Sequence, residues 1–97
     1  MTFSIVVTRI VREETLDALN YYENIRSGLG DDFLEDLEER YTAIAANPYL
    51  FSYTDQLSIL RDVNLHRFPF LIIYKIQANK IIILSDHNTY KKPPSFE

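Results

Sequence analysis

The spacing of hydrophobic positions changes along this chain, and each spacing predicts a different element. Residues 3–7, FSIVV, form a short β-branched run that is typical of a strand. From Val11 to Ile25, apolar or small side chains recur every three or four residues, the spacing of an amphipathic helix. The same spacing resumes at Phe33 and stops before Pro48, because proline cannot continue a helix. The first half therefore predicts one strand followed by two helices.

The segment between the two predicted helices, SGLGDD, favours a tight helical hairpin. Gly28 and Gly30 can end the first helix, and two aspartates suit the positive N-terminal end of the second. The acidic residues of the second helix surround its apolar stripe, and a solvated helix face explains them without a metal cluster. These residues are Asp31, Asp32, Glu35, Asp36, Glu38 and Glu39.

After residue 57 the spacing of hydrophobic positions changes to every second residue, as in a strand. The segment SILRDVNLHR alternates, with Arg61, Val63, Leu65 and Arg67 sharing one face with Ile59. Two nearly continuous apolar runs follow, FLIIYKI and KIIILS, with QAN between them as a hairpin turn. The predicted fold is α+β with the order β-α-α-β-β-β, a curved, mainly antiparallel sheet backed by a helical hairpin, in one domain spanning residues 1–97.

The central predicted strands are apolar on both faces, although two helices can cover only one face. Phe70, Ile72 and Tyr74 alternate with Leu71 and Ile73, which places hydrophobic side chains on either side of the sheet. Strong sheet curvature with long side chains folded over that face is one explanation. The other is a partner chain, either a different protein or a second copy in a homodimer.

Composition excludes several classes of protein. A chain of 97 residues with 46% hydrophobic residues can bury one small core, and the absence of cysteine excludes disulfides and thiolate ligands. Two histidines without HExxH spacing, and two glycines without a following lysine and serine or threonine, favour neither a zinc site nor a phosphate loop. With no long apolar run and no signal-like N-terminus, we expect a cytoplasmic protein without membrane contact, metal or cofactor.

The formal charge of −4 hides an asymmetry between the two halves, since residues 1–55 carry −7 and residues 56–97 carry +3. If the last two strands pair across QAN, Arg67 and Phe68 come near Asp86 and His87. Such a rim could bind a phosphate chain or a carboxylate-bearing peptide. A structural ion pair of Arg61 and plain protection of a strand end by Arg67 are the alternatives. The candidate contact residues are Arg61, His66, Arg67, His87, Tyr90, Lys91 and Lys92.

A set of short motifs, in order along nearly the whole chain, resembles the RelE/ParE superfamily of type II toxin–antitoxin toxins, in particular its ParE-like, plasmid stabilisation branch. The motifs are a YY pair, LG-x-x-F, NP-x-x-F, R-F-P-F with I-I-Y, and a final-strand histidine followed by a basic, proline-containing tail. They stand at Tyr21, Tyr22, Leu29, Gly30, Phe33, Asn47, Pro48, Phe51, Arg67 to Phe70, Ile72 to Tyr74, His87, Lys91, Lys92 and Pro93.

The resemblance implies a small curved sheet backed by a helical hairpin, and a cognate antitoxin that wraps the toxin and covers its second face. It also implies one of two activities. RelE-type members cleave mRNA in the ribosomal A site, with arginine and lysine stabilising the phosphate and a tyrosine or histidine moving a proton. ParE-type members inhibit DNA gyrase.

Three positions depart from the patterns of these branches. Leu71 and Asn88 stand where the nuclease branch usually has arginines, and Tyr90 stands where the ParE-like branch has one. A protein with a pI of about 5.1 is also poorly suited to approach ribosomal RNA. We therefore favour a ParE-like toxin that contacts its target through the candidate residues. The alternatives are a metal-free endoribonuclease, with Arg61, Arg67, His87 and Tyr90 as candidate catalytic residues, and a non-toxic binding module.

Overall fold

The computed structural model describes residues 3–54, 56 and 58–88, with the course of the backbone alone at residues 86–88. The described elements follow the predicted order β-α-α-β-β-β, which is therefore confirmed. They are β1 (Ser4–Val7), α1 (Arg9–Ile25), α2 (Leu29–Ala46), β2 (Leu60–Asn64), β3 (Phe70–Gln77) and β4 (Lys80–Asn88).

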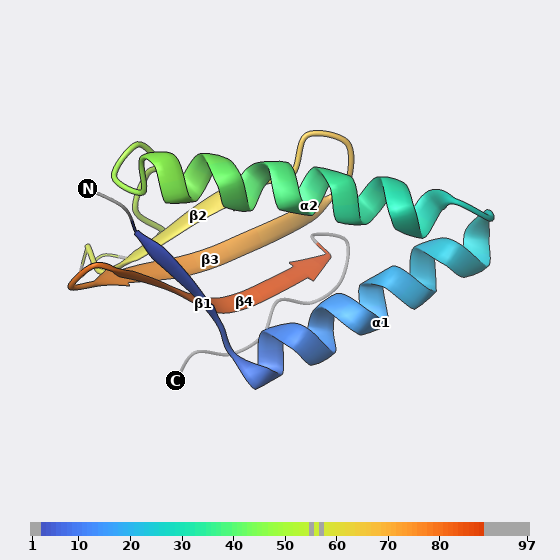
Figure 1. Ribbon diagram of the computed structural model, residues 1–97, viewed down its shortest axis with the longest axis horizontal. Helices are drawn as coiled ribbons and strands as arrows, with labels where there is room; N and C mark the ends of the chain where they lie inside the picture. Colours follow the sequence, from blue (N-terminus) through green and yellow to red (C-terminus); the bar gives the residue numbers. More distant parts are fainter. Residues whose placement is uncertain (1–2, 55, 57, 89–97) are drawn as a thin grey trace.

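The four strands form one open, mixed sheet in the order β1-β4-β3-β2. The pairs β2–β3 and β3–β4 are antiparallel, whereas β1 runs parallel to β4 with Val7 beside Ile83. Thr8 ties the end of β1 to this sheet, because its hydroxyl donates to the Ile83 carbonyl at 3.1 Å and also caps α1. α1 and α2 meet at a short turn and diverge from it (Figure 1). The predicted α+β class is confirmed.

The core lies between the two helices and one face of the sheet. An aromatic group near the turn between the helices joins Tyr22 of α1, Phe33 of α2, Phe68 and Phe70, with ring centroids of neighbouring pairs 4.7 to 5.6 Å apart. Tilted and edge-to-face contacts of this kind add to the free energy gained by burying the rings. The apolar stripe predicted for α1 is buried at Val11 and Tyr22, but Ile25 is 60% exposed because the helix ends there, beyond the sheet.

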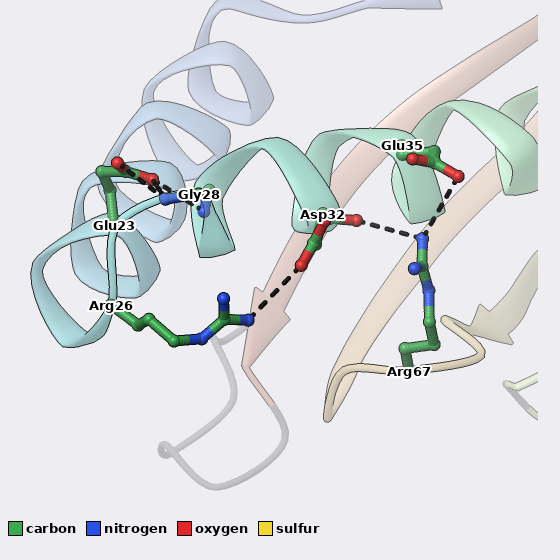
Figure 2. Close-up of polar contacts among 7 residues, drawn as sticks. Glu23, Arg26, Gly28, Asp32, Glu35 and Arg67 are labelled. Carbon is green, nitrogen blue, oxygen red and sulfur yellow. Dashed lines mark hydrogen bonds and ion pairs between the residues drawn. The ribbon is translucent and has the colours of Figure 1, made fainter.

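The helical hairpin predicted from SGLGDD is present, but the two glycines do not end α1, whose C-cap is Arg26, and Gly30 lies within α2. Gly28 begins α2 as its N-cap with a φ of 89°, a conformation that favours glycine. Its missing side-chain cap is replaced by Glu23 of α1, whose carboxylate accepts from the Gly28 and Gly30 amides at 3.1 and 3.0 Å (Figure 2). A Cβ on Gly30 would lie 2.7 Å from Leu19, so this residue permits the close approach of α1 and α2.

One acidic residue of α2 contradicts the prediction of a fully solvated acidic face. Asp36 is completely buried. Its two carboxylate oxygens accept the backbone N–H groups of His66 at 3.2 Å and Arg67 at 2.8 Å, in the loop between β2 and β3. A buried carboxylate is tolerated where hydrogen bonds replace its hydration. Asp36 therefore anchors the β2–β3 loop to the helix.

The alternation predicted for this segment is confirmed in its middle, where Arg61 and Val63 of β2 and Leu65 just after the strand are all buried. It fails at both ends. Ile59 precedes the strand and is 52% exposed, and Arg67 lies beyond the strand in the β2–β3 loop with an exposed side chain. The strand is shorter than the alternating segment because Asp36 draws the chain after Leu65 into the loop.

The face of β3 that points away from the helices also carries hydrophobic side chains. Leu71 and Ile73 alternate with the core residues Phe70, Ile72 and Tyr74. Leu71 is half-buried, whereas Ile73 is buried outside the main core cluster. A partner chain over this face stays a prediction.

Replacement of Asp36 by alanine should destabilise the fold by about 2–4 kcal/mol, since two loop N–H groups lose a charged acceptor. Urea unfolding would measure the loss, with Glu38→Ala, an exposed position of the same helix, as the control. Hydrogen exchange at the His66 and Arg67 amides should accelerate in the Asp36 variant. Equal unfolding midpoints for the two variants would contradict the anchoring role.

Tyr74 should make stability sensitive to alkaline pH. Its hydroxyl donates to the Pro48 carbonyl at 2.6 Å, and burial raises the pKa of the phenol to about 12, a shift that Asp62 increases and Arg61 opposes. An unfolded tyrosine titrates near pH 10, so the unfolded chain loses this proton first. The contribution of Tyr74 is therefore complete below about pH 10 and is lost as the pH rises to about 12.

Tyr74→Phe should cost about 1 kcal/mol at neutral pH through the lost hydrogen bond, and should remove this part of the alkaline destabilisation. Urea unfolding of both proteins at pH 8, 10 and 11 would show the two free energies converging as the pH rises. Tyr53→Phe, at an exposed ring, is the control. Parallel pH profiles for wild type and Tyr74→Phe would refute the assignment.

Candidate functional site

Arg61 is a buried arginine whose guanidinium holds a loop in place. The residue lies in β2 opposite Tyr74 and is 9% exposed. Its Nη1 donates to the carbonyl oxygens of Tyr49, at 3.2 Å, and Phe51. The guanidinium carbon also lies 4.0 Å from the ring centroid of Tyr53 and 5.5 Å from that of Tyr49. Arg61 thus has a structural role, as one of the two alternatives predicted. Its partners are backbone carbonyls and aromatic rings, however, and not an acidic residue of a helix.

A pocket of about 460 Å³ opens beside this guanidinium. Tyr49 and Tyr53 line it together with Arg61, and Ile59 and Ile76 add apolar surface. Ser58 and Ala78 complete the lining, and both have a φ of 57°, which places them in the left-handed region that side chains rarely adopt. The pocket therefore combines one cation, two aromatic rings and two strained backbone positions.

His66 and Arg67 lie together at the other end of β2, in the loop that Asp36 anchors. The Arg67 guanidinium reaches α2, where Nη2 donates to the Asp32 carbonyl at 3.3 Å and lies 3.8 Å from a Glu35 carboxylate oxygen (Figure 2). Asp32 also meets Arg26 of α1 at 3.4 Å. Exposed pairs of this kind contribute little stability, so Arg67 remains available to a partner at this surface.

Asp36, Glu39 and His66 place potential metal-ligating atoms within 4.8 Å of one another. His66 Nδ1 lies 3.9 Å from an Asp36 oxygen, beyond hydrogen-bond distance. Both Asp36 oxygens already accept loop N–H groups, which fixes the carboxylate toward the backbone. We interpret Asp36 and the backbone of His66 as part of the loop anchor, with Glu39 as an exposed neighbour on α2.

The structure places the remaining candidates only in part. His87 lies in β4, and the strand register sets its backbone opposite Leu71 of β3. Tyr90, Lys91 and Lys92 lie outside the described residues. The Arg67 side chain contacts α2, and its predicted convergence with His87 stays a prediction. Arg61 and Arg67 sit at opposite ends of β2 and form no single cluster.

Sequence reasoning missed Asp36 and the two pocket tyrosines. Asp36 stands three residues after Phe33 and one before Leu37, which places it within the apolar stripe of α2. That position was the available signal for its burial. Tyr49 and Tyr53 lie in a segment without periodic spacing, so no sequence pattern connected them to Arg61.

No helix in the described part of the chain is long and apolar enough to cross a membrane. The chain matches no protein-family model, and no curated protein matches it significantly. Its structure resembles a chain in a structure described as the chromosomal ParDE TA system from P. aeruginosa. The TM-score is 0.79 at 16% sequence identity, over 90% of this chain and 96% of that chain. The protein thus shares the fold of that chain, as its sequence motifs predicted.

Proposed function

We propose that this protein is the toxin of a type II toxin–antitoxin system, of the ParE-like kind, and that a cognate antitoxin neutralises it. The observation that carries the proposal is the fold shared with a chain of the ParDE system over 90% of this protein. The half-buried Leu71 leaves apolar surface on the second face of β3, which an antitoxin would cover, whereas Ile73 on the same face is already buried within the chain.

The proposed target is a macromolecule such as DNA gyrase. The geometry around β2 and β3 favours this over ribosome-dependent mRNA cleavage. Leu71, opposite His87 in the sheet register, brings no positive charge to the place where the RelE-type pattern has an arginine. Arg61 is held by loop carbonyls at the far end of β2 from Arg67, so these two cations do not form a joint phosphate clamp.

The proposed contact surface comprises the β2–β3 loop and the final part of the chain. His66 and Arg67 are exposed on the loop, and the candidates after β4 add positive charge to an acidic protein. Charged groups on an exposed rim chiefly set the rate and specificity of association. Substitution of these residues, or of His87, should weaken target binding while the protein still folds.

Expression of the chain without a partner, from a tightly controlled promoter, should arrest growth with a DNA-damage response while mRNA stays intact. Co-expression of the antitoxin encoded beside it should restore growth. Arrest with codon-phased mRNA cleavage would replace this target with the ribosome, and Arg67→Ala and His87→Ala should then reduce cleavage. Normal growth despite soluble, folded protein would overturn the toxin assignment and favour a non-toxic binding module.

Lys91→Ala combined with Lys92→Ala should weaken growth inhibition at least tenfold, measured as the inducer concentration that halves the growth rate. Arg67→Ala should act in the same direction, because it removes an exposed cation from the proposed contact surface. Arg9→Ala is the matched control, since Arg9 is an exposed arginine at the start of α1, paired only with Glu13 among the described contacts. Equal toxicity of all variants would remove these residues from the contact surface.

A further inference from the structure

The guanidinium of Arg61 keeps part of its hydrogen-bonding capacity unused. Nη1 donates to the Tyr49 and Phe51 carbonyls. Among the described residues, none accepts a hydrogen bond from Nε or Nη2 of this side chain. These two nitrogens form the side of the guanidinium that binds a carboxylate through two parallel hydrogen bonds. Arg61 therefore holds its loop with one nitrogen, and no described residue takes the carboxylate-binding edge of this largely buried side chain.

The walls of the adjoining pocket suit the apolar body of such a ligand. The Tyr53 and Tyr49 rings flank the guanidinium, and Ile59 and Ile76 line the same 460 Å³ space. This volume lies within the range of small-molecule sites, which combine apolar walls with a few fixed polar groups. Ser58 and Ala78, the two non-glycine residues with positive φ in the described chain, both border it. Strained backbone of this kind often accompanies binding sites.

We propose that this pocket, named here the Arg61 pocket, binds a carboxylate attached to an aromatic or other apolar group. The carboxylate would take the Nε and Nη2 edge of Arg61, and the apolar group would lie against Tyr53 and Ile76. One guanidinium charge matches one carboxylate charge, and Arg61 is the only cation among the described lining residues. A phosphate dianion would keep half of its charge uncompensated there.

The site is separate from the proposed target surface, because the Arg61 pocket and the β2–β3 loop lie at opposite ends of β2. The inference does not depend on toxicity, and a binding measurement can fail or succeed independently of the growth assay. The carboxylate could be supplied by a free small acid or by an acidic residue or chain end of a polypeptide. Both sources share the chemistry that the pocket recognises.

Titration of the full chain with benzoate and 3-phenylpropionate, followed by NMR, tests the proposal. Saturable shifts should concentrate at Tyr49, Tyr53 and Arg61, with at least tenfold weaker binding of benzamide, which has the ring without the charge. Inorganic phosphate should also bind at least tenfold more weakly. Equal binding of benzoate and benzamide, tighter binding of phosphate, or no saturable shifts at these residues would overturn the proposal.

Tyr53→Ala should weaken benzoate binding at least fivefold by removing one wall of the pocket. Tyr21→Ala is the matched control, since the two tyrosines are 49% and 47% exposed and Tyr21 lies on α1 away from the pocket. Arg61→Lys keeps the charge without the two-nitrogen edge and should reduce, without abolishing, the preference for benzoate over benzamide, in a variant shown to fold by urea unfolding. Unchanged binding in folded Tyr53→Ala would contradict the proposed site.

Two peptides distinguish the sources of the carboxylate. One ends in phenylalanine with a free carboxylate, and the other has an internal glutamate beside leucine and blocked ends. Binding of either peptide more tightly than 3-phenylpropionate supports a polypeptide ligand. Weaker binding of both supports a free small acid, and failure of both peptides and both acids to bind refutes the pocket as a carboxylate site.

Discussion

The buried carboxylate of Asp36 determines how the helical layer is joined to the sheet. Its two hydrogen bonds to the β2–β3 loop fix the start of β3 relative to α2. Phe70 can then meet Phe33 at a centroid distance of 4.9 Å, and Arg67 is brought within reach of Asp32 and Glu35. The aromatic core and the exposed loop thus depend on the same anchor. Without it the loop would carry two amide groups in a partly buried position with no charged acceptor.

A second buried charge performs the corresponding task at the other end of β2. Arg61 binds the loop after α2 through two carbonyl oxygens, and its register partner Tyr74 binds the Pro48 carbonyl of the same loop. Two buried charged residues therefore hold the loops on either side of β2: Arg61 holds the loop before the strand, and Asp36 holds the loop after it. They face different loops and do not neutralise each other, so each relies on backbone dipoles for its compensation.

The sequence could predict the elements because periodicity and turn chemistry are local properties. Gly28 begins α2 in a conformation that favours glycine, and the two apolar runs after Pro69 form β3 and β4 as expected. Burial of Asp36 and exposure of Ile25 could not be predicted in this way. Both depend on where the helices stand over the sheet, which is a tertiary property. The same holds for the Arg61 pocket, whose tyrosines come from a segment without periodic spacing.

The placement of charges also bears on how such a fold can act on a partner. Of the two described candidate arginines, Arg61 is committed to the framework on one side of its guanidinium, while Arg67 makes only exposed contacts. Because the two arginines lie at opposite ends of β2, they cannot act together on one phosphate group, which argues against a joint role in a proposed nuclease. The fixed guanidinium of Arg61, whose Nε and Nη2 have no acceptor among the described residues, is suited to binding a group that comes to it. On this reasoning β2 separates two surfaces of different chemistry, an exposed cationic loop at one end and a preorganised carboxylate pocket at the other.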